Sequence, residues 1–238
     1  MNQTAPMSPL PQRPCCMGLR QLWALVQKDL RIEARSRQTL GLLVVLGLLV
    51  VVVLGLGLGQ QQGSGFQSTA VLWVAYLFSG VLCFEKTMAT ERHDGAMAGL
   101  MLAPLDRGTI YLAKLLGNLL LMLAVALVVT PAGVIFFHFD LSANPLAFVL
   151  VMGLSILGFA SVGTLFAALV SSSRLQGGLL AMVVFPLSLP LVIASTQILL
   201  AVFRDGRPLA GGSLGILAAF DAIFLTASWV LFEWVLEP

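Results

Sequence analysis

Residues 40–59 read LGLLVVLGLLVVVVLGLGLG and contain no polar side chain. A helix of this length rises about 30 Å, which matches the hydrocarbon core of a bilayer. Five more runs have a similar length and composition. They are residues 67–84, 109–137, 145–170, 178–203 and 212–236. The sequence therefore predicts six transmembrane helices.

The overall composition agrees with a membrane protein. Of the 238 residues, 58% are hydrophobic and 10% are charged, whereas soluble domains have about 45–50% apolar and about 25% charged residues. So few charges cannot cover a water-facing surface, so we predict an all-α membrane protein in a lipid bilayer. The formal net charge of +2 gives no reason to expect nucleic acid as a partner.

The N-terminal part differs from the rest. Residues 1–17 contain four prolines and no apolar period, which predicts a disordered cytoplasmic tail. Residues 18–38 place apolar side chains at helical spacing between basic ones, a pattern typical of an amphipathic helix at the membrane surface. Residues 39–238 then form one transmembrane domain.

The basic residues predict the orientation. If the N-terminus is inside, eleven of the 13 Lys and Arg lie on the cytoplasmic side and only Arg204 and Arg207 lie outside. Lys and Arg are enriched in cytoplasmic segments, so both termini are predicted to be cytoplasmic. The one substantial connection between spans, residues 85–108, is then cytoplasmic as well.

That connection has a helical pattern of its own. Residues 84–108 read FEKTMATERHDGAMAGLMLAPLDRG. Met97, Leu100 and Met101 share one face of a helix of about two turns, which Pro104 closes. Such a helix could contact a cytoplasmic partner, and the pattern fits an ordinary interfacial helix without a partner equally well.

Asp221 is the one carboxylate placed well inside a predicted span. A charge there is costly, so we expect a hydrogen-bonded or protonated contact between helices, with Asn118 or Gln197 as its partner. A role in proton relay stays open as the alternative.

Several kinds of chemistry lack their residues. The chain has no G-x-x-x-x-G-K-[ST] loop for nucleotide phosphates. The spans carry no paired carboxylates, no Ser/His couple and no His/Glu metal motif, and Cys15, Cys16 and Cys83 form no CxxC pair. We therefore expect no metal site, no firmly bound cofactor and no enzymatic activity.

Three stretches carry a family resemblance. Glu91-Arg92-x-x-Gly95, followed by Leu100 and Pro104, resembles the coupling segment after the second span of type-2 ABC exporter permeases. ERHDGAMAGLMLAPLDRGTIYLAKLLGNLL (91–120) is similar to the heme exporter protein B family of bacterial cytochrome c maturation. So are KDLRIEARSRQTL (28–40) and AFDAIFLTASWVLFEWVLEP (219–238).

The resemblance implies a non-catalytic permease subunit in the bacterial cytoplasmic (inner) membrane. Its implied partners are an ABC ATPase subunit, which alone binds ATP, a second copy of this chain, and a heme-handling membrane subunit. The assembly would use ATP hydrolysis to export heme or to release a heme-loaded chaperone. The residues implied in a short coupling helix on the ATPase are Glu91, Arg92, His93, Asp94, Gly95, Leu100, Pro104, Asp106 and Arg107.

If heme is the cargo, His138 is the residue best placed to bind it outside the membrane, because it follows the third span and His is a common heme ligand. A simply solvated His138 is the alternative. Two other functions stay open for the chain: a type-2 ABC permease for another amphiphile, and a proton-coupled secondary transporter with Asp221 as its proton site.

Overall fold

The computed structural model describes residues 16–36, 38–57, 65–93, 107–137, 144–171, 178–206, 209 and 211–235. Within these ranges the regular structure is entirely helical. The helices are α1 (Cys16–Ser36), α2 (Gln38–Gly57), α3 (Gly65–His93), α5 (Arg107–Phe137), α6 (Pro145–Ser171), α7 (Leu179–Phe203) and α8 (Gly211–Val235).

Every helix except α1 is long and apolar enough to cross a membrane, which makes six candidate spans among the described residues. The predicted all-α fold with six spans is therefore confirmed. The observed helix bounds differ most from the predicted spans at the end of α3. This helix continues from the predicted end at Phe84 to His93.

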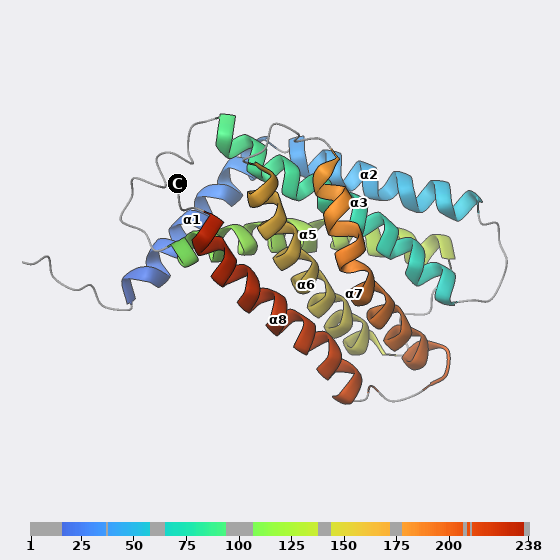
Figure 1. Cartoon of the computed structure of the whole chain (residues 1–238). Coiled ribbons are helices and arrows are strands. Elements are labelled where there is room, and N and C mark those ends of the chain that lie inside the picture. Colours follow the sequence, from blue (N-terminus) through green and yellow to red (C-terminus); the bar gives the residue numbers. More distant parts are fainter. Residues whose placement is uncertain are drawn as a thin grey trace, which may run out of the picture.

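The first and last helices meet the same end of the bundle. In Figure 1, α1, the last turns of α3 and α8, and the first turn of α5 lie at one end. The end of α2, the start of α3 and the end of α5 lie at the other. Six helices that cross the bundle in alternating directions return the end of α8 to the side where α1 lies.

The helix α1 packs against α5. Val26 is buried, whereas Trp23 is 62% exposed. The turn into α2 is held by the Glu33 carboxylate, whose Oε1 accepts a hydrogen bond from the Leu40 backbone N–H at 3.0 Å. This bond satisfies one of the first N–H groups of α2, which have no partner within the helix.

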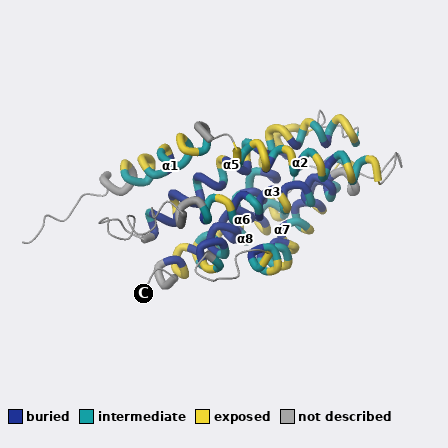
Figure 2. The backbone as a smooth tube through the Cα atoms, turned by 90° about the horizontal axis from the view of Figure 1, so that it is seen from above, coloured by how far each residue is buried: buried dark blue, intermediate teal, exposed yellow. Residues whose placement is uncertain are grey.

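The helices α3 and α6 form the centre of the bundle. In an apolar 18-residue window of each span, 61% of the residues of α3 and 67% of those of α6 are buried, compared with 17% for both α2 and α8. Figure 2 shows the buried backbone concentrated in α3 and α6, with exposed residues along the outer sides of α2 and α7. In a membrane those outer faces would contact lipid or another protein.

Two glycines allow α3 and α6 to pack closely. A Cβ atom on Gly163 of α6 would lie 2.0 Å from the ring of Phe84 on α3, and one on Gly80 of α3 would lie 2.2 Å from the ring of Phe159 on α6. Each helix thus contributes a phenylalanine that fills the space over a glycine of the other. The two rings also contact each other, with centroids 5.3 Å apart.

We predict that Gly163→Ala destabilises the protein by about 1–3 kcal/mol, because its methyl group would overlap the Phe84 ring in a tightly packed centre. The free energy of unfolding, measured by titration with SDS in mixed micelles, tests this. Gly153→Ala on the same helix is the matched control, since nothing lies within 4 Å of its added Cβ. Equal effects of the two substitutions would contradict the packing described above.

Candidate functional site

The predicted coupling segment connects two helices that pack against each other. Residues 91–93 form the last turn of α3, and Arg107 begins α5. The side chains of Glu91, Arg92, His93 and Arg107 lie outside the described part of the structure.

The other predicted coupling residues, Asp94, Gly95, Leu100, Pro104 and Asp106, lie outside it entirely. The coupling helix therefore stays a prediction, and the structure describes the two helices that lead to it.

A chain of polar side chains joins these two helices to the centre of the bundle. The Thr87 hydroxyl of α3 donates a hydrogen bond to Asn118 Oδ1 of α5 at 3.0 Å. The Asn118 amide in turn donates to Thr164 Oγ1 of α6 at 2.9 Å. Asn118 and Thr164 are buried and Thr87 is partly exposed, so this polar triad joins three helices largely inside the bundle.

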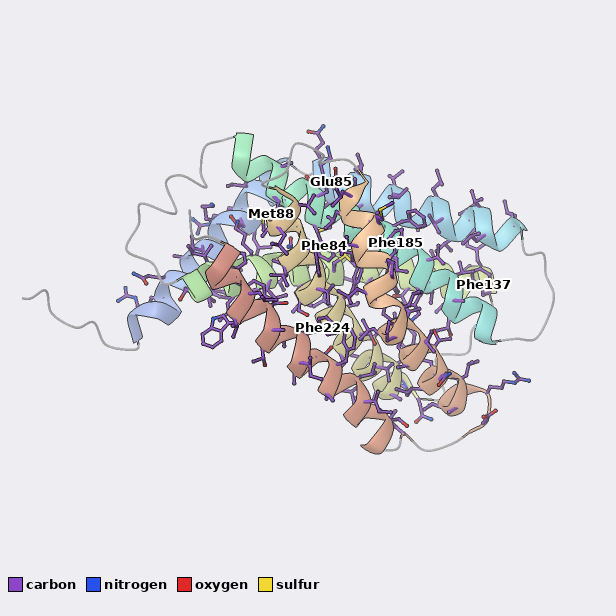
Figure 3. All side chains as sticks on the ribbon, in the orientation of Figure 1. Phe84, Glu85, Met88, Phe137, Phe185 and Phe224 are labelled. Atoms are coloured by element: carbon purple, nitrogen blue, oxygen red, sulfur yellow. The ribbon has the colours of Figure 1, made fainter. Side chains whose placement is uncertain are left out.

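The triad lies close to the coupling segment along the chain. Thr87 precedes Glu91 by four residues, about one helical turn. Figure 3 labels Phe84, Glu85 and Met88 in this part of α3, and Met88 is buried at 3% exposure. The packed centre of the bundle therefore extends along α3 at least to Met88.

Further hydrogen bonds fix α3 and α5 to their neighbours. The Tyr76 and Thr130 hydroxyls lie 2.6 Å apart and join α3 to α5. The Ser79 hydroxyl of α3 donates to the Leu43 carbonyl of α2 at 3.1 Å. Such interhelical bonds contribute on average about 0.6 kcal/mol each in membrane proteins, so the set supports packing more than it replaces it.

An ion pair attaches α1 to this region. Lys114 Nζ of α5 lies 2.6 Å from Asp29 Oδ2 of α1, and Lys114 is 7% exposed. Asp29 also lies 3.1 Å from Lys28 Nζ. Because Lys114 is one turn before Asn118, the contact with α1 and the polar triad lie on successive turns of α5.

The sequence did not predict this ion pair. By sequence, Lys114 is only one of the cytoplasmic charges, although apolar residues surround it in YLAKLLGN. The signal that could have revealed it is the spacing of Lys114 and Asn118, which places both on one helix face. Its partner could not be found from sequence, because Asp29 lies 85 residues away.

Asp221 lies on α8 and points at α6. It is 3% exposed, and neither carboxylate oxygen has a hydrogen-bond partner among the described residues. Its Oδ1 occupies the space next to Gly158, 2.2 Å from where a Cβ would be. A carboxylate in the centre of a membrane helix costs about 2.5–3.5 kcal/mol on the translocon scale.

The predicted partner of Asp221 is wrong. Asn118 bonds to Thr87 and Thr164, and Gln197 has an exposed side chain. The burial of Asp221 was visible in the sequence, but its facing residue depends on how α8 rotates against α6, which the sequence does not encode locally.

His138 follows the last residue of α5 and lies outside the described residues, so its role as a heme ligand stays a prediction. The end of α5 lies opposite the end that carries residues 91–93 (Figure 1). Among the described residues, no group of three His, Cys, Asp or Glu could hold a metal ion. The free thiol of Cys83 is buried.

Six apolar helices, of which α3 and α6 form a close central contact, define a multi-pass membrane protein. The sequence model of the CcmB protein family matches residues 20–232. The chain belongs to that family. Together with the relatives described next, this match confirms the predicted heme exporter protein B family.

Similar proteins include three bacterial relatives that carry the name heme exporter protein B. The relative from Paracoccus denitrificans is 30% identical over 73% of this chain and 80% of its own length. The relative from Haemophilus influenzae is 28% identical over 66% and 70%, and that from Pseudomonas aeruginosa is 28% identical over 67% and 70%.

We predict that Lys114→Met lowers the free energy of unfolding by about 1–3 kcal/mol, since it leaves the partly buried Asp29 carboxylate without its closest partner. SDS titration in mixed micelles measures the change. Arg31→Met removes the same charge from an exposed position of α1 and should have little effect. Recovery of stability in the double variant Lys114→Met/Asp29→Leu would assign the loss to the unpaired carboxylate, and no recovery would contradict that cause.

Proposed function

We propose that the chain is the permease subunit of a heme-exporter-type ABC complex that acts in cytochrome c maturation. The observation that carries this proposal is the likeness to three relatives named heme exporter protein B, over 66–73% of the chain. In this proposal the chain itself is not catalytic. A separate ABC ATPase subunit binds and hydrolyses ATP, and a second copy of the chain and a heme-handling membrane subunit complete the complex.

The coupling route that we propose runs from the segment between α3 and α5 into the bundle. The ATPase would contact residues 91–107, and its movement would pass along the last turns of α3 to Thr87. The bonds of Asn118 to Thr87 and Thr164 support this route because they join both flanking helices to α6. Packed helices of this kind transmit displacements as rigid bodies.

The proposed work of the complex is export of heme or release of a heme-loaded chaperone outside the cytoplasm. Heme is the cargo in this proposal and is not a resident cofactor. His138 is its proposed ligand, since it follows α5 at the end of the bundle opposite the coupling segment. A permease for another amphiphile would use the same coupling route without heme.

We further propose the bacterial inner membrane as the location, with both termini in the cytoplasm. Two observations support this orientation: α1 and the last turn of α8 lie at one end of the bundle (Figure 1), and most Lys and Arg belong to that side by sequence.

Cysteine labelling of intact cells tests the orientation. We predict that His138→Cys reacts with a membrane-impermeant maleimide from outside, whereas His93→Cys reacts only after permeabilisation. Both variants are made in a chain without its natural cysteines, of which Cys83 is buried. The reverse pattern would contradict the proposed orientation and, with it, an ATPase contact at residues 91–107.

Affinity purification tests the proposed complex. We predict that the tagged chain, purified in mild detergent from its own host, brings down an ABC ATPase and carries heme. Recovery of the ATPase without heme, together with normal cytochrome c levels in a deletion strain, would favour the other amphiphile. Recovery of the chain without any ATPase would contradict the proposal and favour an ion-driven transporter.

Thr87→Val tests the coupling route. We predict that it leaves the complex assembled but lowers the yield of mature cytochrome c by roughly threefold, the equivalent of one interhelical bond of about 0.6 kcal/mol. Thr226→Val is the matched control, because the exposed Thr226 hydroxyl bonds to the Ala222 carbonyl of its own helix at 2.5 Å. Equal yields from the two variants would count against transmission through the triad.

A further inference from the structure

The carboxyl group of Asp221 is buried beside Gly158, leucine and phenylalanine side chains. Near the point where Gly158 would carry a Cβ lie Asp221 Oδ1, Leu191 Cδ1 of α7 and the Phe220 ring. Neither carboxyl oxygen meets a hydrogen-bond donor in the described ranges. The missing side chain of Gly158 therefore provides the room for this group between α6, α7 and α8.

Nearby hydroxyl groups on α6 are used elsewhere. The Ser161 hydroxyl donates to the Gly158 carbonyl at 2.8 Å, and the Ser155 hydroxyl donates to the Val151 carbonyl at 2.7 Å. Both protons stay within α6 itself. These two hydroxyl groups of α6 therefore do not stabilise a negative charge on Asp221 in this packing.

The helices packed against α8 are α5, α6 and α7. The sequences of α6 and α7 contain no titratable side chain. On α5 the titratable residues are Arg107, Tyr111 and Lys114, and on α8 the other one is Glu233.

Each of these titratable residues has another contact or lies toward the end of the bundle away from Asp221. The Tyr111 ring contacts Phe232, with centroids 5.3 Å apart, and Lys114 binds Asp29. Phe232 lies 11 residues beyond Asp221 on α8, about 16 Å along the helix. Glu233 follows it, and Arg107 begins α5 four residues before Tyr111, so both belong to the same end of the bundle. Within the described residues, no counter-charge is therefore placed to hold an ionised Asp221.

A carboxyl group in such surroundings favours its neutral form, because the charged form would lose its hydration without gaining a partner. We propose that Asp221 is a proton-binding site that is filled while α8 packs on α6 and is emptied when α8 moves away from Gly158. On emptying, the O–H bond of the acid breaks and its proton passes to a water molecule, with no other bond changed.

The position of α8 agrees with such a movement. Only 17% of the residues in its apolar 18-residue window are buried. The side chains of Ile216 and Ile223 are each 64% exposed. The helix covers α6 from one side, so a displacement of α8 would uncover the space at Gly158, and in the proposal water then reaches the carboxyl group. This inference goes beyond the proposed function and needs neither heme nor an ATPase for its test.

Infrared spectroscopy of the full chain in lipid nanodiscs tests the filled site. The spectrum of the wild type minus that of Asp221→Asn should contain the C=O stretching band of a protonated carboxylic acid at pH 7. Above its midpoint the band should fall roughly tenfold for each pH unit. Asp29→Asn is the control and should leave the band unchanged, since Asp29 is paired with Lys114.

Distances between spin labels test the movement. Labels at Val149 on α6 and Ile216 on α8, both 64% exposed, report the separation of the two helices. The distance should lengthen over the pH range in which the acid band disappears. In Asp221→Asn, which resembles the neutral acid in shape and charge, it should stay short at every pH.

Three results would overturn the proposal. They are a carboxylate band without an acid band at pH 7, an acid band that persists at every accessible pH, and a label distance that is the same before and after the band titrates. None of them bears on heme or on an ATPase partner, so the proposed function would stand or fall separately.

Discussion

The close contact between α3 and α6 is the constraint on which the rest of the bundle depends. Lipid is as apolar as the side chains, so helices in a membrane gain little from burying hydrophobic surface and associate by tight packing and polar contacts. Here Phe84 fills the space over Gly163, and Phe159 fills the space over Gly80. The other spanning helices pack around this pair, and only a small share of the residues of α2 and α8 is buried.

Polar side chains are distributed unevenly over this framework. Toward the end that carries the coupling segment, Thr87, Asn118 and Thr164 bond across three helices, and the Lys114–Asp29 pair adds α1. Elsewhere on α6, Asp221 of α8 lies against Gly158, and its carboxyl oxygens have no hydrogen-bond partner among the described residues. The bonds of Asn118 to Thr87 and Thr164 join α3, α5 and α6. The helix α8 packs extensively on α6, with the Asp221 carboxyl group unsatisfied at the contact. The movement that we propose would separate these two helices.

The predictions from sequence succeeded where the signal is local. Six spans, the helix before them and the family followed from runs of residues that are contiguous in the chain. The largest difference between predicted and observed helix bounds is that α3 continues to His93. The coupling residues and His138 belong to segments outside the described ranges, so their roles stay predictions. Contacts between distant residues were not predictable in this way: Asp221 does not bond to Asn118 or Gln197, and the sequence around Lys114 gives no signal that Asp29 is its partner.

The sequence by itself determined which residues cross the membrane and in what order, because hydropathy and length act within each helix. Only the tertiary structure decided which face of each helix points inward. A span that is apolar on every side has no amphipathic stripe to mark its buried face, as residues 40–59 illustrate. The choice then depends on whether a ring on one helix fits over a glycine on another, and that fit joins residues such as Phe84 and Gly163 that are far apart in the chain.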